Sequence, residues 1–283
     1  MNITGTTRVF FIVGDPVAQV RAPEVYNHLF RRHGVDAVVV PMKVPPAHLA
    51  EFVRHSFTAE NLGGLWVTIP HKAPMLALMD RCSDLARMAG AVNAVRRNAD
   101  GSIEGALFDG VGLVRGLDHF GLSVAGKSVL VLGTGGGGQA VASALAQRGP
   151  ARLALYNRTT TKAADLALRV QQTTGVAVQV AASADPAGFD LVVNCTSQGL
   201  KPDDALPVDP ARIDASAVVV DIIMSRQPTP LLQACAARGI TAHPGFEMLV
   251  WQVPEYLRFF GLPELAQTLQ DDLSEVRGLL APR

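Results

Sequence analysis

Short apolar runs rich in β-branched residues alternate along this chain with stretches of helical periodicity. The first run, RVFFIVG at residues 8–14, is followed by a helical pattern from Pro23 to Arg32. The alternation continues through DAVVVPMKV, AHLAEFVRHSF and LWVTIP, and later through SVLVLG, ARLALYN, DLVVN and SAVVVD. Strands buried on both faces read as continuous apolar runs, and the helices between them connect parallel strands. The pattern therefore predicts an α/β chain with mostly parallel sheets.

Breaks in this alternation predict two domains. A length of 283 residues suits one large or two medium domains, and 48% hydrophobic residues indicate packed cores. Two shorter strand-like segments lie around Ala91–Arg96 and Ile103–Leu107, and GVGLVRGLDHF then starts a helix that leads to a new strand. Beyond the HPG at 243–245 only helical periodicity remains. We expect two α/β domains and a helical tail.

The charge balance argues against several classes of partner. The 25 basic residues match the 25 acidic ones, so no net field attracts nucleic acid or an anionic membrane. No apolar run approaches the roughly 20 residues of a membrane span, and MNITGTTR lacks the plan of a signal peptide. We expect a cytoplasmic protein whose partner is a small molecule.

The three cysteines predict neither a disulfide framework nor a metal site. Cys82, Cys195 and Cys235 are an odd number, widely spaced, with no C-x-x-C motif. We interpret all three as small buried hydrophobic residues.

A glycine-rich segment predicts a dinucleotide site. In VLVLGTGGGGQAVASAL, Gly133, Gly135 and Gly138 fall in G-x-G-x-x-G register between an apolar strand and an Ala-rich helix. The first glycine permits a tight turn, the second lets the backbone approach a pyrophosphate, and the third allows close packing of strand and helix. The helix N-terminus faces the phosphate charge. Gly136 and Gly137 complete the predicted loop, with a merely flexible turn as the alternative.

The end of the next strand favours NADP over NAD. NAD-type folds commonly place a carboxylate there for the ribose hydroxyls. This chain has Asn157, Arg158 and Thr159, with Lys162 one turn further on. A guanidinium thus stands where a 2′-phosphate would lie, although neither cation repels the ribose diol of NAD. The alternative is that Arg158 and Lys162 are solvated at a helix start.

Eight segments spread over nearly the whole chain resemble the shikimate/quinate dehydrogenase family. They are GDPVAQVRAP, WVTIPHK, AGAVNA, GALFDGVG, GTGGGGQA, NRTTTKA, NCTSQG and GFEMLVWQ. The resemblance implies a substrate domain of residues 1–110 and 245–283, and a Rossmann-type NAD(P) domain of residues 111–244. It implies C-terminal helices that return to the substrate domain and an active cleft where the two domains meet. Thr196, in NCTSQG, becomes a candidate cofactor residue.

The resemblance also implies a catalytic pair. The family's lysine at the end of N-V-T-x-P-x-K and its aspartate in N-T-D-G fall on Lys72 and Asp109. An alcohol that loses a hydride must also lose its hydroxyl proton, which a lysine can accept and return. An adjacent carboxylate can orient the ammonium group. Alternatively, Lys72 caps a helix start at the surface and Asp109 is the N-cap of the following helix.

Polar substrate contacts follow by the same comparison. Asn93 matches the family's asparagine that bonds the substrate ring hydroxyls, and Gln252 matches the glutamine of the tail that does likewise. Either could instead be an ordinary buried amide. Tyr26 and Asn27, on the first helix, could also reach the substrate and rank lower.

The substrate segments depart from the family pattern. The family's G-x-P-x-x-H-S-x-S-P loop holds a carboxylate with its two serines, whereas Val20 and Ala22 occupy those positions here. Trp66 replaces the asparagine of N-V-T-x-P, and Phe108 stands where the family has a threonine. These four side chains predict a less polar substrate pocket. The alternative is an acidic substrate whose carboxylate is bound by Arg21 or His71.

We therefore expect an NAD(P)-dependent oxidoreductase that interconverts a secondary alcohol and a ketone. The expected substrate is small, cyclic and relatively apolar, and shikimate should be a poor one because burying its carboxylate among apolar side chains is costly. Two alternatives stay open: a genuine shikimate/quinate dehydrogenase, and a non-catalytic protein that senses NADP.

Overall fold

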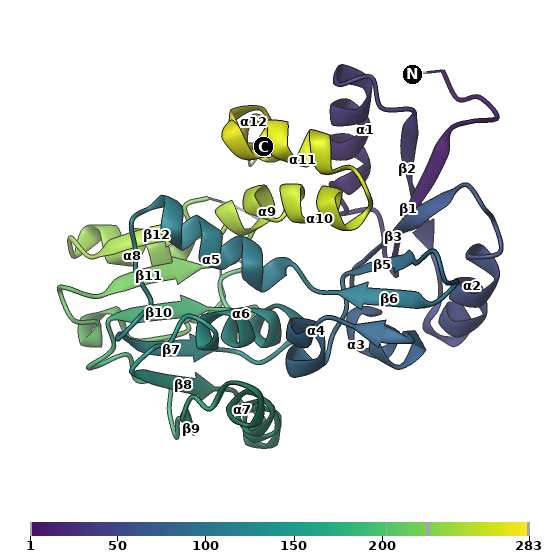
Figure 1. The fold of residues 1–283 in the computed structure, drawn as a ribbon. Helices are drawn as coiled ribbons and strands as arrows, with labels where there is room; N and C mark the ends of the chain where they lie inside the picture. The colour runs from purple at the N-terminus through teal and green to yellow at the C-terminus, as the bar shows by residue number, and fades with distance from the viewer. Residues whose placement is uncertain (1, 202, 225–226, 282–283) are drawn as a thin grey trace. The chain divides into compact units, whose positions relative to one another are not determined.

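The computed structural model describes residues 2–201, 203–224 and 227–281. The chain divides into two compact units (Figure 1). Unit 1 runs to Phe108 and resumes from Val253 to Leu280, and unit 2 runs from Asp109 to Gln252. Each unit combines helices with one sheet, which confirms the predicted α/β class. No helix of the described residues is long and apolar enough to cross a membrane.

The sheet of unit 1 is mixed. Its strand order is β2-β1-β3-β5-β6-β4. β1 is parallel to β2 and β3, whereas β5 is antiparallel to both of its neighbours, β3 and β6. The strands are Arg8–Gly14 (β1), Ala37–Lys43 (β2), Leu62–Val67 (β3), Arg81–Cys82 (β4), Ala94–Arg97 (β5) and Ile103–Ala106 (β6). The sequence did not predict β4, because a strand of two residues has no periodicity to detect.

Helices from both ends of the chain cover unit 1. They are Ala22–Arg32 (α1), Leu49–Ser56 (α2), Lys72–Met75 (α3), Asp84–Ala89 (α4), Val253–Phe259 (α10), Pro263–Asp271 (α11) and Ser274–Leu280 (α12), with 3-10 turns Pro46–His48 (η1) and Leu76–Leu78 (η2). α12 packs against α1, as the yellow and purple helices of Figure 1 show. Glu275 joins them through contacts of 2.8 Å to His28 and 3.0 Å to Arg32. The core of unit 1 includes the fully buried side chains of Phe10 and Leu65.

The sheet of unit 2 is entirely parallel in the described residues. Its order, β12-β11-β10-β7-β8-β9, is that of a Rossmann fold, with two halves that diverge from β7 and β10. The strands are Ser128–Leu132 (β7), Arg152–Tyr156 (β8), Val178–Val180 (β9), Leu191–Asn194 (β10), Val218–Asp221 (β11) and Thr241–Pro244 (β12). β12 was not predicted, because TAHP is short and its residues are only partly buried.

The helices of unit 2 are Asp109–His119 (α5), Gly136–Ala146 (α6), Thr160–Thr174 (α7), Pro230–Ala237 (α8) and Glu247–Trp251 (α9), with a 3-10 turn at Pro210–Arg212 (η3). α9 packs against α5, and glycines make this contact close. A Cβ at Gly112 would lie 2.2 Å from the Met248 carbonyl oxygen. The core between sheet and helices includes Leu130, Leu132 and Val192, all fully buried.

The cysteines differ in burial. Cys235 is buried, as predicted, whereas Cys82 and Cys195 are only partly buried. Cys82 ends the edge strand β4, which leaves one side of the residue uncovered. Burial raises the pKa of the Cys82 and Cys235 thiols above their ordinary value, which favours the protonated form.

Asn27 supports the exposed edge of the unit 1 sheet. β2 is an edge strand, so backbone groups on its outer side lack a neighbouring strand. The Asn27 side chain replaces that strand at one residue: its Nδ2 donates to the Val39 carbonyl at 2.9 Å, and its Oδ1 accepts from the Val39 N–H at 2.7 Å.

We predict that Asn27→Ala lowers the free energy of unfolding by about 1–3 kcal/mol, because both backbone groups of Val39 lose their partner. Urea denaturation would measure the loss. Asn61→Ala is the matched control, since its amide makes one long bond of 3.3 Å to Thr7. Equal effects of the two substitutions would contradict the role of Asn27.

Candidate cofactor and substrate sites

The central strands of unit 2 end at one level. In the paired registers, Asn194 of β10 lies opposite both Leu132 of β7 and Asp221 of β11, and Leu132 lies opposite Tyr156 of β8. Parallel strands present their carboxyl ends at the same edge of the sheet, and ligands of open α/β sheets bind there, where the strand order diverges. The loops that follow these four strands therefore converge on one place.

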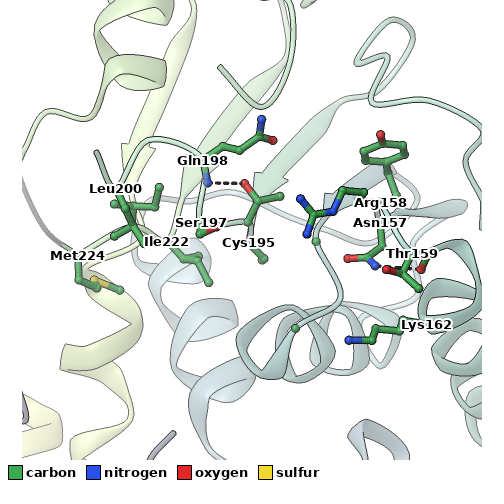
Figure 2. A pocket seen from close by; sticks show the side chains of 15 residues that line it. Asn157, Arg158, Thr159, Lys162, Cys195, Ser197, Gln198, Leu200, Ile222 and Met224 are labelled. Carbon is green, nitrogen blue, oxygen red and sulfur yellow. Dashed lines mark hydrogen bonds between the residues drawn. The ribbon is translucent and has the colours of Figure 1, made fainter. Parts of the chain in front are cut away.

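A cavity of about 730 Å³ lies at this edge. It is lined by residues of the loops after β7, β8, β10 and β11 and of the first turn of α7: Gly133, Gly135, Tyr156, Asn157, Arg158, Thr159, Lys162, Cys195, Thr196, Ser197, Gln198, Leu200, Ile222, Ile223 and Met224. Figure 2 shows Asn157, Arg158, Thr159 and Lys162 on one side, and Cys195, Leu200, Ile222 and Met224 on the other. The structure thus brings together seven of the ten predicted cofactor residues.

Gly133 and Gly138 allow β7, the glycine loop and α6 to pack closely against one another and against the loop after β10. Gly133 has a φ of +87°, and a Cβ there would lie 2.9 Å from the carbonyl carbon and oxygen of Cys195. A Cβ at Gly138 would lie 1.9 Å from the Gly133 carbonyl oxygen. Any larger residue at Gly138 would push α6 away from β7. These are the first and third roles expected of the motif.

The middle of the glycine loop leaves room for a ligand. A Cβ at Gly135 or Gly136 would meet no atom within 4 Å, whereas one at Gly137 would approach Ile222 at 3.1 Å. α6 begins at Gly136, so its first N–H groups and its positive dipole end face this open space. The chemistry suits a phosphate or pyrophosphate. Gly136, Gly137 and Gly138 do not line the cavity itself.

Asn157 holds the two sides of the loop region in place. Its Oδ1 accepts from the Thr134 N–H at 3.0 Å, and its Nδ2 donates to the Thr159 carbonyl at 2.9 Å. Both ends of the amide are therefore bound to backbone. Asn157 shapes the site, while the exposed side chains of Arg158 and Lys162 supply its positive charge.

The loop after β10 is ordered by side-chain bonds to the strand end. Thr196 Oγ1 donates to Asn194 Oδ1 at 2.7 Å and accepts from the Gln198 N–H at 3.1 Å. Burial, with Asp221 as a second contribution, raises the pKa of the Cys195 thiol above its ordinary value. This shift favours the protonated thiol, and Cys195 lines the cavity as a small side chain.

The sequence did not predict Tyr156 or seven other residues that line the cavity. The seven are Cys195, Ser197, Gln198, Leu200, Ile222, Ile223 and Met224. A usable signal was present, because the strands DLVVN and SAVVVD were predicted and the residues after each parallel strand gather at one edge. Among the described residues, no group of three or more His, Cys, Asp or Glu could hold a metal ion.

Lys72 follows the turn after β3, and the buried side chain of His71 holds this turn in place. The His71 side chain is fully buried, and its Nε2 donates to the Val44 carbonyl at 2.7 Å. Its backbone N–H bonds the Thr68 carbonyl, and its carbonyl accepts from Met75. Lys72 then opens α3 and is partly exposed. His71 thus anchors the turn that connects the buried strand β3 to Lys72.

Asn93 is fully buried and lies close to β3. Its Oδ1 accepts from the Phe108 N–H at 3.0 Å, and its backbone carbonyl accepts from the Val67 N–H at 2.8 Å. Its Nδ2 has no hydrogen-bond partner among the described residues. A buried donor without a partner is costly and is suited to a ligand acceptor.

Aromatic rings fill the space around Trp66. We define the aromatic cluster as Tyr26, Trp66, Phe108, Tyr256 and Phe260. The Trp66 ring centroid lies 4.4 Å from those of Tyr26 and Phe260 and 5.6 Å from that of Tyr256. Phe108 meets Tyr256 edge-on at 5.2 Å. Trp66 is only 3% exposed, so it belongs to the core of unit 1 as well as to any pocket beside it.

Tyr256 is a member of this cluster that the sequence analysis did not identify. It lies on α10, and its hydroxyl is 3.5 Å from the Asn93 carbonyl oxygen. It therefore connects Trp66, Phe108 and Asn93, three of the predicted substrate residues. Helical periodicity alone marked Tyr256 as an ordinary buried position.

Three side chains of unit 1 have structural partners that compete with a role in binding. Asn27 is bound to β2 at both ends of its amide. Arg21 pairs with Glu24 at 3.0 Å and donates to the last carbonyls of α12. His71 is buried against Val44. His71 Nδ1 has no hydrogen-bond partner among the described residues, and a carboxylate bound by Arg21 or His71 stays an alternative prediction. Val20 and Ala22, on either side of Arg21, are partly buried at the start of α1.

Unit 2 holds the other two predicted polar residues. Asp109 is the first residue of α5 and is 6% exposed. The next residue packs against α6, since a Cβ at Gly110 would lie 2.1 Å from the Ala140 carbonyl oxygen. Gln252 follows α9 and is buried, and its Oε1 has no hydrogen-bond partner in the part of the chain described. Like Asn93, it offers a polar atom that a ligand could satisfy.

Comparison with known proteins finds matches to one family in both parts of the chain. The shikimate dehydrogenase substrate binding domain matches residues 12–95, and shikimate / quinate 5-dehydrogenase matches residues 117–231. A protein of Methylobacterium radiotolerans named shikimate dehydrogenase (NADP(+)) is 38% identical over 277 residues, which cover 93% of this chain and 97% of that protein.

Two solved structures show the same fold. Shikimate dehydrogenase from Aquifex aeolicus has a TM-score of 0.81 at 30% identity, covering 96% of this chain and 100% of that one. The ligand-free 5-ketofructose reductase of Gluconobacter sp. strain CHM43 has a TM-score of 0.81 at 29% identity, covering 94% and 98%. These matches confirm the predicted enzyme class, an NADP-dependent oxidoreductase acting on a CH–OH group, and the chain belongs to the shikimate/quinate dehydrogenase family.

Proposed function

We propose that this chain is an NADP-dependent dehydrogenase that interconverts a secondary alcohol and a ketone on a small ring compound less polar than shikimate. The observation that carries the substrate assignment is the aromatic cluster. Rings stand at positions 66 and 108, where the family resemblance expects an asparagine and a threonine, and Tyr256 packs against both rings. Aromatic faces favour flat or apolar ligands.

The proposed chemistry assigns the proton to Lys72. The bound nicotinamide provides the hydride chemistry. In the oxidation, Lys72 accepts the hydroxyl proton of the alcohol, and in the reduction it returns that proton to the carbonyl oxygen. Asp109 orients the ammonium group by its negative charge. Asn93 Nδ2 and Gln252 Oε1 are proposed to bind the remaining polar groups of the ring.

The proposed cofactor contacts follow from the cavity in unit 2. Arg158 and Lys162 are proposed to bind the 2′-phosphate of NADP, because among the described residues they are the cations that line the cavity. The open space over Gly135 and Gly136, at the start of α6, receives the pyrophosphate. Asn157 and Thr196 hold the surrounding loops in position.

A specific observation favours a second candidate, shikimate dehydrogenase itself. The relative from Methylobacterium radiotolerans carries that name at 38% identity. Against it stand Val20 and Ala22, which have no hydroxyl to offer a carboxylate. The 5-ketofructose reductase of the same fold is named for a different substrate. A non-catalytic NADP sensor is the third candidate, and reduced nicotinamide formed with any cyclic alcohol would exclude it.

We predict that Lys72→Ala lowers kcat by roughly 10²–10⁴-fold, the usual contribution of one acid–base group. The substrate would be the best of a panel of cyclic alcohols, with NADPH absorbance as the readout. The Kd for NADP+ should stay unchanged, because the variant leaves the cavity of unit 2 intact. Lys43→Ala is the control for loss of a surface lysine of unit 1. Undiminished kcat in Lys72→Ala would contradict the proposed chemistry.

We predict that Arg158→Ala weakens NADP+ binding by roughly 10- to 100-fold, because charge-assisted hydrogen bonds contribute about 1.5–3 kcal/mol each. Binding of NAD+ should change little, since it has no 2′-phosphate. Isothermal titration calorimetry with both cofactors measures the difference. Lys127→Ala is the matched control, because Lys127 precedes β7 at the opposite edge of the sheet. Tighter binding of NAD+ than NADP+ by the unchanged protein would also contradict this assignment.

We predict that shikimate is a poor substrate and that Val20→Ser/Ala22→Ser improves it. Two hydroxyl donors to a carboxylate would contribute roughly 3–6 kcal/mol, or about 10²–10⁴-fold in kcat/KM. The double variant should recover part of that factor, whereas Val17→Ser/Ala18→Ser in the same loop should recover none. Steady-state assays decide the point. A kcat/KM near 10⁵ M⁻¹s⁻¹ for shikimate with the unchanged protein, ordinary for a competent enzyme, would contradict the proposed substrate class.

A further inference from the structure

A buried polar network lies at the ends of two strands of unit 2. Asn194 ends β10, Asp221 ends β11, and Thr229 precedes α8; all three are fully buried. Asn194 Nδ2 donates to Asp221 Oδ1 at 3.0 Å, and Thr229 Oγ1 donates to Asp221 Oδ2 at 2.6 Å. Neither Asp221 nor Thr229 lines the cavity, and the proposed chemistry uses none of the three.

The network reaches both loops on one side of the cavity. On the β10 side, Asn194 Oδ1 accepts from the N–H of Thr196 at 3.0 Å, and its Nδ2 also approaches the Gln198 carbonyl at 3.3 Å. On the β11 side, Asp221 Oδ1 accepts from the Ile223 N–H at 3.2 Å. Thr196, Gln198 and Ile223 all line the cavity. One carboxylate therefore connects two loops that follow neighbouring strands.

We propose that Asp221 is a positioning residue for the cofactor. Asp221 holds the loop after β10 through Asn194 and the loop after β11 through the Ile223 N–H, in the arrangement that NADP requires. These loops lie across the cavity from Arg158 and Lys162 (Figure 2). They would support the part of the dinucleotide that lies beyond its 2′-phosphate end. The inference rests on the proposed cofactor contacts of the same cavity.

The bonding pattern fits an ionised carboxylate. Three donors, the Asn194 amide, the Ile223 N–H and the Thr229 hydroxyl, point at its two oxygens. Thr229 Oγ1 in turn accepts from the Leu232 N–H at 3.3 Å, so its own proton is directed to Asp221. An apolar side chain of the same size could fill the space, but it would leave these donors without a partner at the base of the loops.

Burial raises the pKa of Asp221, and the three hydrogen bonds act in the opposite direction. The titratable groups facing it are the thiols of Cys195 and Cys235, with Arg238 beside the latter. A carboxyl whose pKa is raised in the folded state contributes stability at low pH that is lost as the pH rises through the folded pKa. Ionisation of Asp221 therefore costs stability in the folded protein, which a role in the cofactor site would explain.

The test compares the affinities of two ligands for Asp221→Ala, Asp221→Asn and Asn194→Ala. NADP+ would extend across the whole cavity, whereas adenosine 2′,5′-bisphosphate reproduces only the end of NADP+ that carries the 2′-phosphate. Calorimetry at pH 7 should show NADP+ binding about tenfold weaker in Asp221→Ala and Asn194→Ala, the effect of one lost charge-assisted bond of about 1.5 kcal/mol. Affinity for adenosine 2′,5′-bisphosphate should stay within about twofold, because that end does not rest on the network.

The conservative and control variants separate positioning from general stability. Asp221→Asn keeps an oxygen for Asn194 and Ile223 but loses the charge, so its NADP+ affinity should lie between those of Asp221→Ala and the unchanged protein. Ser143→Ala is the control for a buried polar group of unit 2, since Ser143 Oγ has no hydrogen-bond partner among the residues described. It should change neither ligand. In urea unfolding over a pH series, the unchanged protein should lose stability relative to Asp221→Asn as the pH rises through the folded pKa of Asp221.

Distinct results would overturn the inference and the proposed site. Unchanged NADP+ affinity in Asp221→Ala and Asn194→Ala, or parallel loss of both ligands in both variants, would show that the network does not position the cofactor loops. If Asp221→Ala alone fails to fold, Asn194→Ala decides. Arg158→Ala should weaken both ligands. If it weakens neither, the assignment of the cavity is wrong, whatever the Asp221 variants show.

Discussion

The register of the parallel strands in unit 2 is the constraint on which the cofactor site depends. β7, β10 and β11 pair so that Leu132, Asn194 and Asp221 end the strands side by side. The loops that follow must therefore share one edge, and the cavity forms among them. The same register places the Asn194 amide against the Asp221 carboxylate. A slip of one residue would separate the pair and turn each side chain to the other face of the sheet.

The aromatic cluster of unit 1 belongs both to its core and to the proposed substrate site. Trp66 and Tyr256 are buried in the aromatic cluster, so they contribute to stability through the area that they remove from water. Trp66 and Phe108 stand where the family resemblance expects an amide and a hydroxyl, and the Trp66 Nε1 has no hydrogen-bond partner among the described residues. The aromatic cluster thus stabilises unit 1, and the proposed preference for less polar substrates rests on the same rings.

The glycines and the cations of the candidate cofactor site could be named from the sequence, whereas the residues that line its far side could not. Gly133 and Gly138 are required by local sterics, which spacing reveals. Arg158 could be placed because it follows the next strand. Asn157 was expected to bind the cofactor, and the structure shows its amide bonded to backbone at both ends. Met224 and the rest of the wall after β11 come from a strand far along the chain, and only strand order brings that wall to the site.

The sequence by itself determined the α/β class, most strands and the position of the glycine loop, because periodicity and close-packing sterics act over a few residues. Tertiary structure decided which polar side chains are used internally. Arg21 is bound to the end of α12, more than 250 residues away, and Asn27 to β2. In the sequence Asp221 is only the last residue of an apolar strand, and its partner Asn194 becomes apparent when β10 and β11 pair. The hydrogen-bond partners of buried polar side chains depend on contacts between distant parts of the chain, and a local sequence pattern does not reveal these contacts.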